Sequence, residues 1–457
     1  MRKGIKFLSV ILVALMLVSV PVNFAHAAIG ATAVWEIRTS GAATNGGGYT
    51  SGGTDYTLQD AAQLTLSDLA SDGAGTGISS VTGGFTAAMI GNIIQITGAG
   101  DGFTLGFYEV TAYTDTNNIT IDRTAGATKT GGTGSVGGCL ANISDMSAQV
   151  AGNTIYLKST GTYTLGANFT AAVAGTGALS ISWIGYTTTR GDGGKAVIAC
   201  GAYYMNMSGG FQGVDSLDIS GTSGVVVYGG YQGSVRNCKI NNTSVTADRV
   251  AYQAQSAGSF LITGSEFISD KGLALNIANT IAHANIKGNY IHDSKNGCRL
   301  YGGLSSFTFN ILDTFTATAL DLGTSYGVLV ENNTFYNGVT GINGDTAYQI
   351  DIRNNIIDSF TTGASWTAEV LQNCWDYNNW NGNTTDVSNV TKGANALALD
   401  PQFEGAAGGD FSIGENLKAA GIPGTFPGGL STGYMDIGAV QREESGGGGP
   451  CVGLIGG

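Results

Sequence analysis

Between residues 234 and 357 the chain repeats one pattern of apolar and polar positions. Six segments share it: SVRNCKI, FLITGSEF, NIKGNYI, SFTFNIL, LVENNTF and DIRNNII. Each has an apolar residue before a polar pair and another after it, and no segment has helical periodicity. A period of about 22 residues built from short strands predicts a solenoid whose coils each bury these two positions. The first apolar column is Val235, Ile262, Ile286, Phe307, Val330 and Ile352. The second is Ile240, Phe267, Ile291, Leu312, Phe335 and Ile357.

The polar pair between the two columns is rich in asparagine. Its second position holds Cys238, Ser265 and then asparagine in four successive segments. Asparagine tolerates the left-handed backbone of a tight corner, and asparagines stacked on neighbouring coils can hydrogen-bond along the axis. We therefore predict one corner where the side chains form an amide ladder, made by Asn289, Asn310, Asn333 and Asn355.

A third short strand follows in each repeat, in GLAL, GCRL, ALDL, GING and GASW (from residues 272, 297, 319, 341 and 363). Strand, corner, strand, loop and strand together resemble the right-handed parallel β-helix of the pectate-lyase-like superfamily, in an exported bacterial or phage-type member. NTIYLKSTGTYTLG (153–166) is similar to the first coils of such proteins, and DPQF, DFSI and DIGAV (400–440) to their closing segments. The resemblance implies an all-β, single-stranded right-handed parallel β-helix preceded by a small N-terminal β-module.

The ends of the chain differ from the repeats. Residues 1–27 combine Arg2, Lys3 and Lys6, an apolar run and Ala25-His26-Ala27, which predicts a secretory signal peptide. No later segment is long and apolar enough for a membrane span, so a secreted or cell-surface protein is expected. The expected divisions are an N-terminal β-module or cap at 28–138, the β-helix at 139–395, closing coils and a C-terminal cap at 396–442, and a flexible Gly-rich tail with Cys451 at 443–457.

Composition and charge exclude several classes of partner and site. The net charge of −13 becomes about −16 once the basic leader is removed, which argues against nucleic acid as a partner. Six widely spaced cysteines without a CxxC pair exclude zinc ribbons and thioredoxin chemistry. Three histidines, one of them in the leader, provide no histidine metal cluster.

The resemblance also points to where chemistry would lie. Enzymes of this superfamily carry their groups on the outward row of the third-strand sheet and in the loops before it. Here that row is expected to hold Ala274, Arg299, Asp321, Asn343 and Ser365. Calcium-assisted β-elimination needs a base beside a uronate carboxylate and a cation that stabilises the developing charge. The candidates are Lys295 and Arg299 as catalytic groups, and Asp293, Asp313 and Asp321 as calcium ligands.

Each candidate also has a purely structural interpretation. Asp293, Asp313 and Asp358 share one turn position where aspartate caps the backbone, and Arg299 beside Asp321 can be a cross-coil ion pair. Aromatic residues around Trp375 can stack on sugars or close the solenoid. The sequence thus predicts a protein that engages extracellular polysaccharide, either as a lyase or glycoside hydrolase, or as a non-catalytic adhesin or structural spike.

Overall fold

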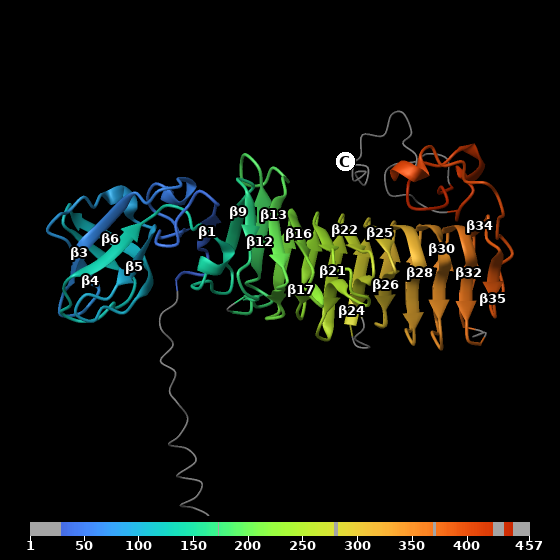
Figure 1. Cartoon of the computed structure of the whole chain (residues 1–457), viewed down its shortest axis with the longest axis horizontal. Helices are drawn as coiled ribbons and strands as arrows, with labels where there is room; N and C mark the ends of the chain where they lie inside the picture. The colour runs from blue at the N-terminus through green and yellow to red at the C-terminus, as the bar shows by residue number, and fades with distance from the viewer. Residues whose placement is uncertain (1–28, 172, 278–281, 369–371, 424–433, 442–457) are drawn as a thin grey trace, which may run out of the picture.

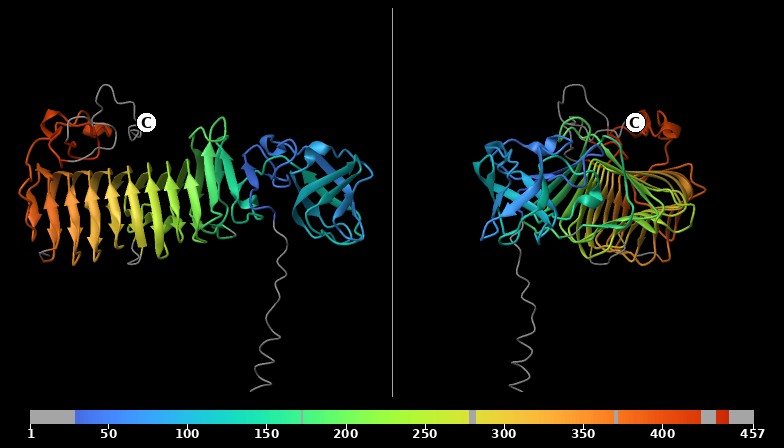
Figure 2. Two further views of the ribbon diagram at one scale, coloured as in Figure 1. Left: turned by 180° about the vertical axis from the view of Figure 1, so that it is seen from behind. Right: turned by 60° about the vertical axis from the view of Figure 1, so that its left-hand side comes forward.

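The computed structural model describes residues 29–171, 173–277, 282–368, 372–423 and 434–441. The predicted signal peptide, the Gly-rich tail and Cys451 lie outside the described residues. Most of the chain is a parallel β solenoid whose coils stack along one long axis, as Figures 1 and 2 show from several sides. After the first coils, each coil gives one strand to a 12-stranded sheet and two to a 17-stranded sheet.

The 12-stranded sheet holds the strands that precede the asparagine corner. In spatial order they are β2 (Gly48–Tyr49), β1 (Val34–Ile37), β9 (Thr154–Lys158), β12 (Ile181–Tyr186), β15 (Gln212–Asp215), β18 (Ser234–Arg236), β21 (Gly258–Thr263), β24 (Ala282–Lys287), β27 (Ser306–Thr308), β29 (Leu329–Glu331), β31 (Asp351–Arg353) and β33 (Cys374–Asp376).

The 17-stranded sheet contains two stacks, which merge where β28, β30 and β32 run through the second corner without a break. The stack after the asparagine corner holds β10 (Thr162–Thr164), β13 (Ala196–Gly201), β16 (Leu217–Gly221), β19 (Lys239–Asn242), β22 (Glu266–Ser269), β25 (Tyr290–Ser294), β28 (Ile311–Gly323), β30 (Thr334–Gly344), β32 (Ile356–Trp366) and β34 (Asn379–Asn381). The third-strand stack holds β11 (Phe169–Thr170), β14 (Met205–Met207), β17 (Val225–Gly229), β20 (Val250–Ala254), β23 (Leu273–Ile277), β26 (Asn296–Leu300), the second halves of β28, β30 and β32, and β35 (Thr385–Ser388).

The two predicted apolar columns form the solenoid core. Val235 pairs in register with Ile262, and the pairing continues coil by coil to Ile352. All twelve column residues are buried, with at most 1% of the surface of any of them exposed. The prediction of one continuous buried column is therefore confirmed.

The amide ladder is also confirmed, and it is longer than predicted. Asn289 Nδ2 donates to Asn310 Oδ1 at 2.9 Å, and the same bond repeats to Asn333, Asn355 and the unpredicted Asn378. Each Oδ1 also accepts the backbone N–H of the asparagine one coil earlier. The left-handed backbone, however, falls on the residue before each ladder asparagine, as at Asn332 with φ 56°. The left-handed backbone and the ladder hydrogen bonds, both expected of one asparagine, thus belong to two neighbouring residues.

The N-terminal module is a closed antiparallel barrel inserted into the first coil. Its strands are β3 (Leu64–Ser71), β4 (Gly77–Ser79), β7 (Asn118–Ile121), β6 (Gly106–Asp115), β5 (Ile93–Gly98) and β8 (Gly132–Val136). The sequence places strands at 92–98, 107–113 and 118–124, where β5, β6 and β7 lie. The module does not begin at residue 28, because β1 pairs in parallel with β9 and belongs to the solenoid.

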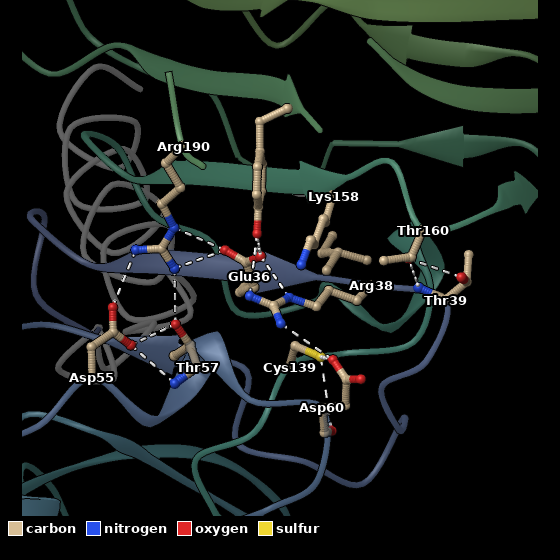
Figure 3. Close-up of polar contacts among 12 residues, drawn as sticks. Glu36, Arg38, Thr39, Asp55, Thr57, Asp60, Cys139, Lys158, Thr160 and Arg190 are labelled. Carbon is tan, nitrogen blue, oxygen red and sulfur yellow. Dashed lines mark hydrogen bonds and ion pairs between the residues drawn. The ribbon is translucent and has the colours of Figure 1, made fainter. Parts of the chain in front are cut away.

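A buried charge network joins the barrel's leading segment to the solenoid (Figure 3). Glu36 on β1 is fully buried. Its carboxylate contacts Arg38 Nε at 2.9 Å and Arg190 Nη2 at 2.8 Å, and accepts the Tyr186 hydroxyl. Arg190 lies in the loop after β12 and also contacts Asp55 Oδ2 at 3.1 Å. The network therefore fixes β1, the segment that enters the barrel, and a solenoid loop against one another.

The closing segment folds back over the outer face of the last coils. Phe403 and Phe411 pack edge-on against Tyr336 of β30. Ile356 of β32 forms a small apolar cluster with residues of the closing segment. Figures 1 and 2 show this segment, in red, lying along the solenoid beside β30 to β34. The DPQF and DFSI segments predicted to close the solenoid therefore cover its side as well as its end.

Candidate functional site

The third-strand stack presents one outward row of side chains along the solenoid, which we call the outer row. Neighbouring members are paired strand to strand, and the residues on either side of each point into the core. Seven of the nine carry an amide or a hydroxyl group, and the other two, in the middle of the row, are charged. Neighbouring coils stack at about 4.8 Å. The row consists of Asn206, Tyr228, Gln253, Asn276, Arg299, Asp321, Asn343, Ser365 and Ser388.

The expected row is correct from Arg299 onward and wrong at Ala274. Ala274 is fully buried, and Asn276 pairs with Arg299 in the position predicted for it. Both Ala274 and Leu275 lie in the main core, while Leu273 packs in a separate small cluster. The alternation of inward and outward side chains is interrupted in β23. Strict alternation therefore predicts that Ala274 points outward, whereas Asn276 occupies that position.

Arg299 and Asp321 lie side by side on the outer row. Arg299 Nε is 3.6 Å from Asp321 Oδ2, and the guanidinium lies 5.4 Å from the centre of the Tyr301 ring. Asp321 also accepts the Tyr301 hydroxyl at 2.7 Å and the Asn343 amide at 3.1 Å. Asp321 is thus engaged by its neighbours, as the structural interpretation of this pair expects.

The other three predicted residues lie elsewhere. Lys295, just before β26, contacts Asp248 at 2.8 Å. Asp293 has a left-handed backbone at the second corner, with φ 46°, and contacts His292 Nδ1 at 2.8 Å. Asp313 accepts the Tyr290 hydroxyl at 3.2 Å. The structure therefore divides the five candidates among three separate sets of contacts.

The three predicted calcium ligands do not share a binding position. In the described part of the chain, no three His, Cys, Asp or Glu side chains are grouped so that they could hold a metal ion. Asp293, Asp313 and Asp321 would each have to exchange protein partners for the ion. A calcium site at these carboxylates remains a prediction from the resemblance and has no support in the geometry.

Lys239, Glu266 and His292 form a cluster across three coils in the stack after the asparagine corner, which the sequence did not predict. Glu266 accepts Lys239 at 2.8 Å and contacts His292 Nε2 at 3.1 Å. The His292 ring stacks on Tyr290 with centroids 4.0 Å apart. The sequence gives no local signal for the contact between His292 and Glu266, because 26 residues separate them.

The ionisation of this cluster follows from its pairing. Burial opposes the charged form of His292, but hydrogen bonds to Glu266 and Asp293 outweigh it and raise the His292 pKa. Burial likewise opposes the Glu266 carboxylate, but its bonds to His292 and Lys239 lower the Glu266 pKa to about 2. Burial raises the pKa of Asp313. These groups satisfy one another, so the cluster is a network that stabilises the coils.

His292→Gln should destabilise the protein most in mildly acidic solution. A raised folded-state pKa contributes stability that is complete below the unfolded value near 6.5 and is lost as the pH rises through the folded value. We expect a cost of about 1–3 kcal/mol at pH 5.5 and a smaller cost at pH 9, measured by urea unfolding. His283→Gln is the control, because the His283 ring contacts a backbone carbonyl. An equal cost at both pH values would contradict the charged pairing.

One part of the outer row has polar atoms without partners. Asn276 is only 8% exposed, and its Oδ1 has no hydrogen-bond partner among the described residues. Arg299 Nε, on the neighbouring strand, also lacks a hydrogen bond within the described part of the chain. On the other side, Tyr228 packs edge-on against Tyr204 with centroids 5.2 Å apart. This stretch of the row combines aromatic surface with unused hydrogen-bonding capacity.

The aromatic residues around Trp375 belong to the last coils of the core. Trp375 and Trp380 are 5% and 2% exposed, and Trp375 packs edge-on against Trp366. They close the solenoid, as one of the two interpretations of the sequence expected. No described helix is of the length and apolar character needed to cross a membrane.

Comparison with known proteins identifies the class of fold. The family described as "Right handed beta helix region" matches residues 223–391. The solenoid is therefore a right-handed parallel β-helix, and the all-β fold class that the resemblance implied is confirmed. No curated protein matches the sequence.

Several solved structures are similar to this chain. The pectate lyase Pel9A is 15% identical, with a TM-score of 0.46 and coverage of 67% of this chain and 92% of that one. The lacto-N-biosidase of Eubacterium ramulus is 9% identical, with a TM-score of 0.39 and coverage of 57% and 65%. Tailspike protein 2 of the Escherichia coli O157:H7 bacteriophage CAB120 is 11% identical, with a TM-score of 0.35 and coverage of 77% and 51%.

Proposed function

We propose that this protein binds an extracellular polysaccharide along the outer row. The observation that carries the proposal is the row itself, a line of mostly half-buried side chains on nine successive strands, seven with an amide or hydroxyl group and two charged. A rigid line of hydrogen-bonding groups at a regular spacing fits an extended chain of repeating units, because the same contacts can recur along it.

The contacts expected of such a ligand come from two kinds of side chain. Tyr228 and Tyr204 offer aromatic surface with a polar tip, which suits the mixed apolar and hydroxyl surface of a sugar ring. Gln253, Asn276 and Asn343 offer amide donors and acceptors beside it. The expected leader, which lies outside the described residues, places this surface where extracellular glycans occur.

The geometry of the outer row supports binding better than it supports catalysis. The residues predicted for β-elimination, Lys295 and Arg299, are each paired with a carboxylate, that of Asp248 and that of Asp321. An uncommitted base beside the reacting carbon is the first requirement of proton abstraction. We therefore place polysaccharide binding first, and keep lyase activity as a hypothesis that the same assay tests.

Tyr228→Ala should weaken polysaccharide binding at least about tenfold, or roughly 1.4 kcal/mol, because it removes the half-exposed ring from the row. Affinity electrophoresis of the purified protein through gels containing different polysaccharides measures the change. Glu331→Gln is the matched control, because Glu331 lies on β29 in the other sheet and contacts Arg353 on the next coil. The same samples are followed for unsaturated sugar ends, with and without calcium.

Three results would count against the proposal. The first is retention by no polysaccharide in the panel. The second is equal weakening by Tyr228→Ala and Glu331→Gln, which would indicate a general loss of structure. The third is full binding by Tyr228→Ala, which would place the ligand on another face. Release of unsaturated ends would restore the lyase hypothesis.

A further inference from the structure

We infer that the corner between the third-strand stack and the 12-stranded sheet is a contact surface for a second copy of this chain. This inference goes beyond the proposed function, which concerns the outer row. We call the surface the corner face. It consists of that corner and of the first outward position on the strand that follows it, a row that extends over seven strands from Ser182 on β12 to Leu329 on β29.

The corner face carries no formal charge from acidic or basic side chains. On seven successive coils its segments contain no Asp, Glu, Lys or Arg, although these residues make up 12% of the chain. The next outward row of the same sheet, by contrast, holds Asp215, Arg236, Lys287 and Glu331. The cores of protein interfaces are depleted in charged residues in the same way. The segments are 171–183, 208–214, 230–235, 255–262, 278–286, 301–307 and 324–330, in which 172 and 278–281 are included by sequence alone.

Large apolar side chains are exposed along the corner face. Leu304 is 67% exposed, Tyr231 is 45% exposed and Tyr348 is 42% exposed. Tyr326 is paired with Tyr348 on the next coil, and their rings stack with centroids 5.9 Å apart. Exposed apolar surface that recurs on neighbouring coils is typical of an interaction site.

Glycine on the neighbouring coil allows these side chains to lie flat. A Cβ atom at Gly258 would lie 2.6 Å from Cδ2 of Tyr231, and one at Gly327 would lie 2.9 Å from Cδ2 of Leu304. Both large side chains therefore lie against backbone that has no side chain of its own. A flat face whose coils repeat at about 4.8 Å can meet the same face of a second molecule coil by coil.

Leu304 also occupies a backbone conformation that does not favour leucine. Its φ is 48°, and the same corner position on the next two coils holds Gly327 and Gln349, which are left-handed as well. Glycine and asparagine enter this region most readily. A leucine that is strained and exposed adds nothing to the solenoid core, but it can fill a contact with a partner.

The charge of the chain identifies the partner. Each copy has a net charge of −13, so two copies repel each other wherever their charged surfaces approach. A close contact between copies therefore requires a face without charges, and the corner face has this property. A sugar is a poorer fit, because rings that stack on each other, as those of Tyr326 and Tyr348 do, leave less open ring surface for it.

The size of the corner face determines the expected strength of the contact. Seven coils give a length of about 34 Å, and the corner with its adjoining strand position gives a width of about 15 Å. Two such faces would bury about 1,000 Å² in total, which is the lower limit for a specific interface. We therefore expect a reversible dimer with a dissociation constant in the micromolar range rather than a permanent one.

Sedimentation velocity of the purified protein from about 1 to about 200 μM tests the inference. We expect dimerisation that strengthens with salt, because salt screens the repulsion between acidic chains and the corner face has no ion pairs to lose. Leu304→Glu and Tyr348→Glu should each raise the dimer dissociation constant at least about tenfold, because each places a charge in an apolar contact. Val245→Glu is the matched control and should leave it unchanged, because Val245 is 88% exposed at the second corner, between β19 and β20.

The other outcomes overturn the inference without touching the proposed polysaccharide binding. A monomer at every concentration rules out the contact. A dimer that both glutamate variants leave intact places the contact on another surface. A monomer that cosediments with phosphatidylcholine vesicles, and no longer does so after Leu304→Glu, would make the corner face a lipid-binding surface instead. Thermal unfolding of each variant identifies one that is misfolded, and Tyr231→Glu then takes its place.

Discussion

Glu36→Gln is expected to destabilise the junction between barrel and solenoid by about 3–5 kcal/mol, because removing one partner of a buried ion pair leaves the other charges uncompensated. Arg38 and Arg190 both direct donors at the Glu36 carboxylate, which has no exposed surface. An amide side chain would turn N–H groups toward them. Urea unfolding of the variant should show an earlier transition, and protease cleavage between β2 and β3 should become faster.

The control for Glu36→Gln is the same chemical change at an exposed ion pair. Asp270 is largely exposed and forms an ion pair with the neighbouring Lys271 at 3.1 Å. Asp270→Asn should therefore change stability by less than about 0.5 kcal/mol, as exposed pairs contribute little. A cost for Glu36→Gln no larger than that of Asp270→Asn would mean that the network in Figure 3 does not hold the junction together.

Asn333→Ala is expected to cost about 2–5 kcal/mol, because it leaves two buried backbone groups of the preceding coil without partners. Asn333 Nδ2 donates to the Phe307 carbonyl at 2.8 Å, and its Oδ1 accepts the Asn310 backbone N–H at 2.8 Å. Water cannot replace these bonds easily, since Asn310 and Asn333 are fully buried. The free energy of unfolding, measured in urea, should fall accordingly.

A second substitution at Asn333 distinguishes the contribution of the ladder hydrogen bonds from that of side-chain packing. Ser265 occupies the same column, where its hydroxyl oxygen accepts the Cys238 backbone N–H at 3.1 Å. Asn333→Ser should therefore keep the bond to Asn310 and cost less than Asn333→Ala. The surface control is Asn285→Ala, which removes an exposed amide from β24. Equal costs for the serine and alanine variants would show that the ladder hydrogen bonds contribute little.

The parts of the fold that the sequence predicted are those repeated on every coil. A buried column requires an apolar residue at one position in each repeat, so six repeats gave six independent indications of the same register. The ladder was predictable for the same reason, up to Asn355. Asn378 follows Asn355 at the usual spacing of 23 residues, and it was missed because the two apolar columns are continued there by Trp375 and Trp380.

The candidate site was less predictable, because pairing between coils depends on side-chain directions that the repeat does not specify. Arg299 and Asp321 were placed on one row correctly, since they share a regular strand position. Asn276 was missed because two successive inward residues precede it in β23. Glu36 was missed because two of its partners, Tyr186 and Arg190, follow it by 150 and 154 residues, beyond the inserted barrel.

The insertion of the barrel has a consequence for the order in which the chain assembles. Val34 of β1 pairs with Thr154 of β9, and the whole barrel lies between them in the sequence. A chain emerging from its N-terminus therefore completes the barrel before β1 can find β9. Until then Trp35, which is fully buried in the finished protein, can pack against the barrel residue Phe107 and the short β2 strand. The barrel is thus positioned to shelter the first strand of the solenoid and to offer the later coils a completed surface on which to grow.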